Sequence, residues 1–126
     1  MKKLKLVGFY RELPHGLKSG PSLGDMISTY PQEEEMKIVS YLKQGLVIIA
    51  CIGRATDILS EKEIVIGSPH ILTDGEWAWP NDLAYYVETY HAKVPSAFIE
   101  YMKENNWVVP DNIETDEIEV KEGKVW

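Results

Sequence analysis

Imidazole, carboxyl and indole groups gather between positions 70 and 82, the part of the chain best suited to acid–base chemistry. The residues are His70, Asp74, Glu76, Trp77, Trp79 and Asp82. Apolar rings beside a carboxyl or imidazole group can shift its pKa toward neutrality, so that the group can act as an acid or a base. One interpretation is therefore a small enzyme or small-ligand-binding protein, with a pocket near His70, Trp77 and Trp79 and with Asp82 beside it.

Ordinary structural roles account for most of these residues, and we favour them. The Asp74-Gly75 dipeptide is typical of a hairpin turn. Asp82 falls in the first turn of an expected helix, where the helix dipole favours a carboxylate. A cross-strand contact with Trp79 explains His70. We therefore assign no catalytic residue and treat the enzyme as the weaker alternative.

Other sites with recognisable chemistry are not indicated. Cys51 lies within the apolar run 46–52 and is expected to be a buried, inert thiol. The histidines His15, His70 and His91 stand apart, and no His or Cys pair has metal-ligand spacing. The glycines of segment 16–22 lack the Gly-Lys-Ser/Thr ending of a phosphate loop. We predict no metal and no cofactor.

The charge balance restricts the partners. The 126 residues carry a net charge of −7. Contacts to a phosphate backbone need clustered Lys and Arg, so nucleic acid is not expected as a partner. An acidic protein favours encounter with a basic one. Lysines interrupt the first apolar positions and no apolar run is long enough to cross a bilayer, so we expect a cytoplasmic protein without a membrane partner.

The hairpin predicts a register. A type I′ turn at Asp74-Gly75 would pair Leu72 with Trp77 and His70 with Trp79. Alternation then places these four side chains on one face. Large aromatic side chains on one face of a hairpin are more often core than exposed. Glu76 would point from the opposite face toward solvent or a partner.

The first half of the chain should supply a strand over 4–10, a loop over 11–22 and two helices. Ser22 can cap a short helix with its hydroxyl group, and Thr29 with Gln32 forms a capping box for the helix that ends near Gly45. The run 46–52 is apolar throughout, which is the pattern of a central strand covered on both faces.

The second half should add a short strand over 64–67, the hairpin and two helices. Pro80 would open one helix, and residues 94–96 would start the last. We expect these helices to form a C-terminal αα-hairpin. The chain is thus predicted to be a single α+β domain over 1–110, with a mainly antiparallel sheet and packed helices. The acidic segment 111–126 forms either a terminal strand or hairpin, turning at Glu122-Gly123, or a solvated tail.

Three stretches carry a resemblance. They are Phe9-Tyr10-Arg11-Glu12-Leu13, Gly20-Pro21-Ser22-Leu23, and Ile71-Leu72-Thr73-Asp74-Gly75-Glu76-Trp77-Ala78-Trp79-Pro80 followed by Asp82-Leu83-Ala84-Tyr85-Tyr86-Val87. The chain up to residue 110 resembles a family of small uncharacterised bacterial proteins with an Asp-Gly-x-Trp-x-Trp-Pro core. Some members resemble immunity proteins of polymorphic toxin systems. The resemblance implies a toxin as partner and carries no catalytic residue.

The leading hypothesis is a non-enzymatic protein-binding module, plausible as an immunity protein that occludes a basic toxin domain. Partner contacts are expected from aromatic and acidic side chains, because aromatic residues beside carboxylates are common interface anchors. The candidates are Glu76, Tyr85, Glu88, Trp77 and Trp79. A subunit of a homo-oligomer is a further alternative.

Overall fold

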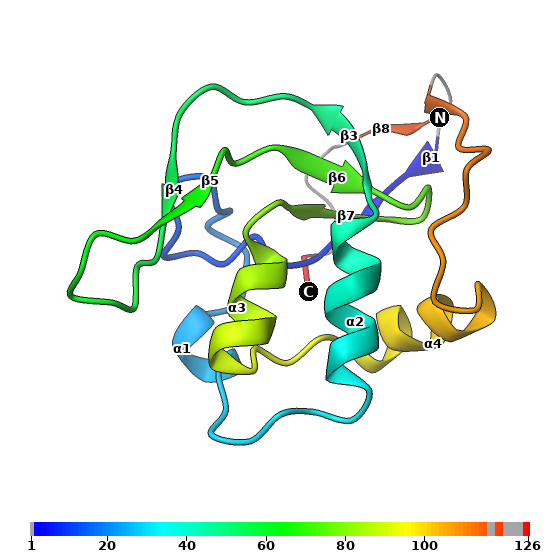
Figure 1. The fold of residues 1–126 in the computed structure, drawn as a ribbon. Helices are drawn as coiled ribbons and strands as arrows, with labels where there is room; N and C mark the ends of the chain where they lie inside the picture. The colour runs from blue at the N-terminus through cyan, green and yellow to red at the C-terminus, as the bar shows by residue number, and fades with distance from the viewer. Residues whose placement is uncertain (1, 116–117, 120–124) are drawn as a thin grey trace.

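The computed structural model describes residues 2–115, 118–119 and 125–126. It confirms a single α+β domain (Figure 1). The elements in chain order are β1 (Lys2–Lys3), β2 (Lys5–Leu6), α1 (Leu23–Met26), α2 (Glu35–Lys43), β3 (Leu46–Ile49), β4 (Ala55–Thr56), β5 (Val65–Gly67), β6 (Ile71–Thr73), β7 (Trp77–Pro80), α3 (Leu83–Tyr90), α4 (Ser96–Glu104) and β8 (Ile118–Glu119).

The central sheet has the strand order β2-β7-β6-β3. β6 pairs antiparallel with both β3 and β7, whereas β2 pairs parallel with β7. The strand predicted over 4–10 is much shorter, because the chain leaves the sheet after Leu6. Gly8 follows with φ of 82°, a conformation that an extended strand does not use.

The prediction of a central strand over 46–52 is wrong. β3 spans Leu46–Ile49 and lies at an edge of the sheet. The exposed fractions of Leu46, Val47 and Ile49 are 43%, 47% and 40%. An apolar run has the same composition whether it is covered on both sides or exposed at an edge, so composition alone could not place it.

The hairpin has a different turn from the predicted one. Thr73 pairs with Ala78 and Leu72 with Trp79, which places the turn at Gly75-Glu76. Gly75 has φ of 95°, as the first position of a type II′ turn requires. The Asp74 side chain accepts hydrogen bonds from the amides of Glu76 and Trp77 at 2.9 and 2.7 Å. The register differs from the predicted one by two residues, an even number, so Leu72, Trp77 and Trp79 keep their predicted shared face. The predicted pairing of His70 with Trp79 is wrong, because Trp79 pairs with Leu72.

Helix α2 begins later than the sequence predicts. The side chain of Gln32 binds the carbonyl of Ala92 and the amide of Val94, at 2.7 and 3.1 Å. It ties the chain before α2 to the α3–α4 connection, so the predicted capping box with Thr29 does not form. α2 starts at Glu35, after Glu34 in the left-handed region with φ of 62°.

The start of α1 is also stabilised differently. The Ser22 hydroxyl makes no cap hydrogen bond and instead donates to Glu12 at 2.8 Å. The Glu12 carboxylate accepts hydrogen bonds from the amides of Leu23 and Gly24, at 3.0 and 3.4 Å. Glu12, eleven positions before the first residue of α1, therefore performs the capping that was predicted for Ser22.

Helices α2 and α3 run antiparallel side by side, and α2 lies between α3 and α4 (Figure 1). The two C-terminal helices are present, but Pro80 ends β7 and does not open α3, which begins at Leu83. The main helical neighbour of α3 is α2, however, so α3 and α4 do not form the close pair that was expected from their adjacency in the sequence.

Two hydrophobic clusters cover the two faces of the sheet. The larger one, under the helices, contains Trp77, Trp79, Tyr41 and Phe98, and the rings of Trp77 and Phe98 stack with centroids 4.7 Å apart. The smaller cluster consists of Leu4, Leu6, Phe9 and Ala78. Alternation along β7 thus places Ala78 opposite the two tryptophans.

Described residues of the acidic C-terminal segment lie beside the N-terminal strands. Ile118–Glu119 pairs parallel with β1, and the amide of Trp126 donates to the carbonyl of Leu6 at 2.8 Å. The Trp126 ring lies 5.4 Å from that of Trp77. The predicted turn at Glu122-Gly123 lies outside the described residues.

Candidate functional site

The two tryptophans of the hairpin belong to the core. Trp77 and Trp79 are fully buried, and the Trp79 indole donates a hydrogen bond to the carbonyl of Leu42 at 3.1 Å. Their surfaces are occupied by helix residues. The predicted roles of these rings in contacting a partner or a ligand are therefore corrected to packing.

Asp74 and Glu76 hold the hairpin in place. Asp74 is buried and accepts a hydrogen bond from the Tyr41 hydroxyl at 2.6 Å. Burial raises the pKa of Asp74 despite this hydrogen bond. Glu76 forms ion pairs with Lys2 and Lys5. Burial acts to raise the pKa of Glu76, but the hydrogen bonds from both lysines outweigh it and lower the pKa. Glu76 thus connects the turn to β1 and β2 and is not a free partner contact.

His70 and Asp82 have different partners. The amide of Cys51 donates a hydrogen bond to Nδ1 of His70 at 2.9 Å. Asp82 is buried and lies beside His15, with Oδ2 2.9 Å from Nε2. The predicted acid–base cluster is therefore divided: Asp74 faces Tyr41, His70 faces Cys51, and Asp82 faces His15. The sequence does not indicate that Asp82 and His15 are neighbours, because the two residues are far apart in the chain and only the tertiary structure brings them together.

Tyr85, a predicted partner contact, is engaged within the chain. The hydroxyls of Tyr85 and Tyr90 donate to Asp57 at 2.7 and 2.6 Å. This carboxylate also accepts hydrogen bonds from the amides of Leu59 and Ser60. The sequence indicates only a polar connection over 55–63, and nothing in its pattern shows that Asp57 joins this connection to α3.

Glu88 is the predicted contact that stays accessible. Its side chain is 54% exposed, and Nζ of Lys43 lies 4.0 Å away. Exposed ion pairs of this length are weak. Glu88 can therefore exchange Lys43 for a basic group of a partner.

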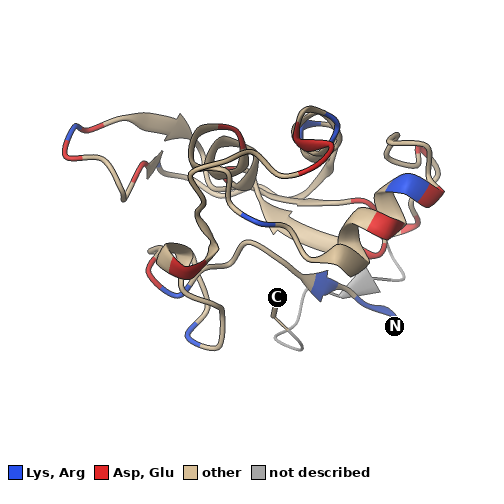
Figure 2. Cartoon of the chain, turned by 90° about the horizontal axis from the view of Figure 1, so that it is seen from below, with Lys and Arg blue, Asp and Glu red and all other residues tan. Residues whose placement is uncertain are grey.

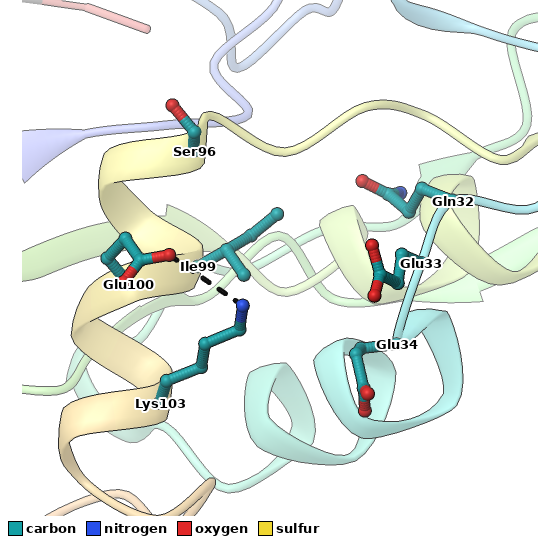
Figure 3. A pocket seen from close by; sticks show the side chains of 7 residues that line it. All are labelled: Gln32, Glu33, Glu34, Ser96, Ile99, Glu100 and Lys103. Atoms are coloured by element: carbon teal, nitrogen blue, oxygen red, sulfur yellow. Dashed lines mark ion pairs between the residues drawn. The ribbon is translucent and has the colours of Figure 1, made fainter.

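An acidic groove of about 210 Å³ lies between the segment before α2 and helix α4 (Figure 3). Its lining consists of Gln32, Glu33, Glu34, Ser96, Ile99, Glu100 and Lys103. Lys103 pairs with Glu100 at 3.7 Å on the α4 side, and Glu33 and Glu34 lie on the other side. Glu34 also pairs with Lys37 at 3.1 Å, so two of the three carboxylates already face an ammonium group, and Glu33 is the one best placed to receive a basic side chain. In the sequence, Glu33 and Glu34 indicate only a helix start favoured by the helix dipole.

The second exposed feature is the β3 edge surface, which we define as Leu46, Val47 and Ile49. Among the described residues, no strand pairs with the outer side of β3. Charged residues lie mainly on the helices, the loops and the N-terminal strands (Figure 2), and β3 has none. Proteins commonly protect open edges with charges or proline. This edge, in contrast, offers backbone hydrogen-bonding groups and apolar side chains together.

Metal ligation, membrane insertion and similarity to known proteins give no further indication of function. In the described part of the chain, no group of three or more His, Cys, Asp or Glu residues could hold a metal ion. None of the helices in that part has the length and apolar character needed to span a membrane. No family model, curated protein or solved structure shows significant similarity to the chain.

Proposed function

We propose that this protein is a non-enzymatic protein-binding module and that the β3 edge surface receives its partner. The observation that carries the proposal is the uncharged, exposed edge of β3. An extended segment can add to such an edge through backbone hydrogen bonds, while apolar side chains supply contact area. Leu46, Val47 and Ile49 would provide this area.

The partner that fits best is a basic protein. The net charge of −7 would accelerate encounter with a positively charged surface. The acidic groove and Glu88 offer places for its Lys or Arg side chains. The resemblance to immunity proteins suggests that this partner is a basic toxin domain and that binding occludes it.

The alternative of a small enzyme or ligand-binding protein near His70, Trp77 and Trp79 has less support. Both tryptophan rings are buried, and the Nδ1 atom of His70 is occupied by the amide of Cys51. A ligand at this place would have to displace core packing.

The proposal can be tested with the protein encoded next to this gene, by calorimetry and by protection of cells that express it. The double variant Val47→Lys/Ile49→Lys places two charges on the β3 edge surface and should weaken binding by about tenfold or more. Met36→Lys is the matched control, because Met36 is a 78% exposed apolar residue on α2.

Two outcomes would overturn the proposal. One is that the neighbouring protein shows neither binding nor protection. The other is that the double variant and Met36→Lys bind equally well. Light scattering on the isolated chain tests whether the β3 edge surface binds a second copy of this chain. A wild-type dimer that becomes a monomer in the double variant would show that it does.

A further inference from the structure

A short two-stranded ribbon projects from the body of the protein. It is formed by β4, β5 and the residues around them, and we call residues 52–67 the β4–β5 arm. In both views the arm extends away from the central sheet (Figure 1, Figure 2). Large apolar side chains on it are exposed, and Ile52 is fully so; the others are Ile58, Leu59, Ile64 and Val65. Concentrations of exposed apolar side chains mark contact surfaces.

Hydrogen bonds from α3 hold the arm in place. Asp57, which follows β4, accepts hydrogen bonds from the hydroxyls of Tyr85 and Tyr90. The Tyr86 hydroxyl accepts the amide hydrogen of Ile58 at 3.2 Å. A surface that is fixed before binding loses little conformational freedom when a partner covers it. The arm therefore presents its apolar side chains in a pre-organised form.

The exposed charges of the arm balance one another. Arg54 and Lys62 are positive, and Glu61 and Glu63 are negative, whereas the whole chain carries a net charge of −7. A basic protein gains no net attraction from such a surface. Two copies of this acidic chain, in contrast, repel each other least where their local charge is balanced. The charge distribution thus favours a second copy as the occupant of the arm.

Arg54 and Glu63 make the arm complementary to itself. The guanidinium of Arg54 lies 3.7 Å from Oε1 of Glu63, and the two side chains are 69% and 74% exposed. An exposed ion pair of this length is weak, so each group can exchange its partner for the same group of another molecule. In a dimer with twofold symmetry both copies use the same patch. Arg54 of either copy can then pair with Glu63 of the other.

We propose that the β4–β5 arm is the contact surface of a symmetric homodimer. Apolar side chains of the two arms pack against each other around Ile52, and Arg54 and Glu63 form reciprocal ion pairs between the copies. The arm does not include Leu46, Val47 or Ile49 of the β3 edge surface. The dimer therefore goes beyond the proposed protein partner and does not depend on it.

Sedimentation velocity on the full chain tests the dimer between about 1 µM and about 1 mM, the range of weak specific association. We expect the sedimentation coefficient to rise with concentration to the value of a dimer. Ile52→Asp should weaken dimerisation by about tenfold or more, because it places a charge at the centre of the contact. Met36→Asp is the matched control, since Met36 is a 78% exposed apolar residue on α2, and its effect should stay within about twofold.

The reciprocal ion pairs allow a test by charge exchange. Arg54→Glu and Glu63→Arg should each weaken the dimer by about tenfold, because both pairs between the copies become repulsive. An equimolar mixture of these two variants should regain the wild-type affinity, since opposite charges then meet at both contacts. Pairing within one chain cannot produce this recovery. Arg11→Glu changes the net charge as Arg54→Glu does, at an exposed position outside the arm, and should leave the dimer within about twofold.

A chain that stays monomeric at every concentration would overturn the proposal. Equal effects of Ile52→Asp and Met36→Asp, or a mixture of the charge variants that associates no more tightly than each variant alone, would do the same. Circular dichroism checks that these exposed substitutions leave the fold intact. A dimer that is lost in Val47→Lys/Ile49→Lys but kept in Ile52→Asp would contradict the arm and place the contact on the β3 edge surface. Failure of the neighbouring protein to bind would affect the proposed function alone.

Discussion

The hydroxyl group of Tyr41 on α2 donates a 2.6 Å hydrogen bond to Oδ2 of Asp74 beside the hairpin turn. Oδ1 of the same carboxylate accepts the amide hydrogens of Glu76 and Trp77. One buried side chain thus fixes the turn and attaches it to a helix 33 positions away in the sequence. The hairpin depends on tertiary structure as well as on its own turn residues.

Tyr41→Phe should lower the free energy of unfolding by about 1–3 kcal/mol, because it removes a donor from a buried carboxylate without creating a large cavity. Urea denaturation measures the change. Tyr30→Phe is the control, since Tyr30 is 78% exposed, and its effect should stay within about 0.5 kcal/mol. Equal effects of the two substitutions would show that the Tyr41 hydroxyl is dispensable.

Asp57 should contribute stability that depends on pH. Burial acts to raise the pKa of Asp57, but hydrogen bonds from Tyr90, Tyr85 and two amides outweigh it and lower the pKa. The folded protein therefore binds a proton less readily than the unfolded chain, whose Asp pKa is about 3.9. The contribution is complete above about pH 5 and is lost as the pH falls through the folded-state pKa.

Asp57→Asn tests this directly. The difference in unfolding free energy between the wild type and this variant should be largest near neutral pH and should shrink under acid. Asp111→Asn, at an exposed position, should show little difference at any pH. A difference for Asp57→Asn that does not change with pH would contradict the assignment of charged hydrogen bonds.

Gly45 permits close packing between the end of α2 and the sheet. A Cβ atom at this position would lie 2.7 Å from Cβ of Leu72 and 2.7 Å from Cζ2 of Trp79. Gly45→Ala should therefore destabilise the protein by about 1–3 kcal/mol through overpacking. Gly24→Ala serves as the control, because the nearest atom there is 3.6 Å away. Thermal unfolding of the two variants should separate them clearly.

Glu12 should control the stability of α1 locally. Its carboxylate accepts the amides of Leu23 and Gly24, so Glu12→Ala should cost about 1 kcal/mol, as loss of a helix cap does. Hydrogen exchange at these two amides should accelerate, while exchange in α3 should stay unchanged. Glu104→Ala, at an exposed position at the end of α4, is the comparison. Unchanged exchange at Leu23 would exclude the capping role.

Local patterns predicted the elements whose determinants are local. The spacing of Leu83, Tyr86, Val87 and Tyr90 predicts the inner side of a helix, and in α3 the first three are buried while Tyr90 is partly buried. The inward positions predicted for the last helix are Phe98, Ile99 and Met102. In α4 Phe98 and Met102 are buried and Ile99 is partly buried. Alternation predicted that Trp77 and Trp79 share a face, and the error of two residues in the register did not affect this. Helical and strand periods are properties of short segments, and short segments are visible in a sequence.

The remaining features depend on residues that are distant in the sequence. Asp57 meets Tyr85 and Tyr90 across 28 and 33 positions, and Asp82 meets His15 through a loop. The edge position of β3 depends on which strands lie beside it, which its apolar composition does not reveal. The roles predicted for the candidate site residues therefore needed more correction than the predicted fold class.

The parallel pairing of β2 with β7 also sets an order of assembly. Lys5 lies opposite Trp77, so this contact closes a very long loop, whereas α2, β3, the hairpin and α3 form one continuous stretch of chain. Loop closure delays distant contacts. Leu72→Ala should therefore slow refolding in stopped-flow experiments, whereas Leu6→Ala should mainly accelerate unfolding. Until β2 pairs with β7, the edge of β7 is open as well as that of β3, and open strand edges of this kind favour aggregation.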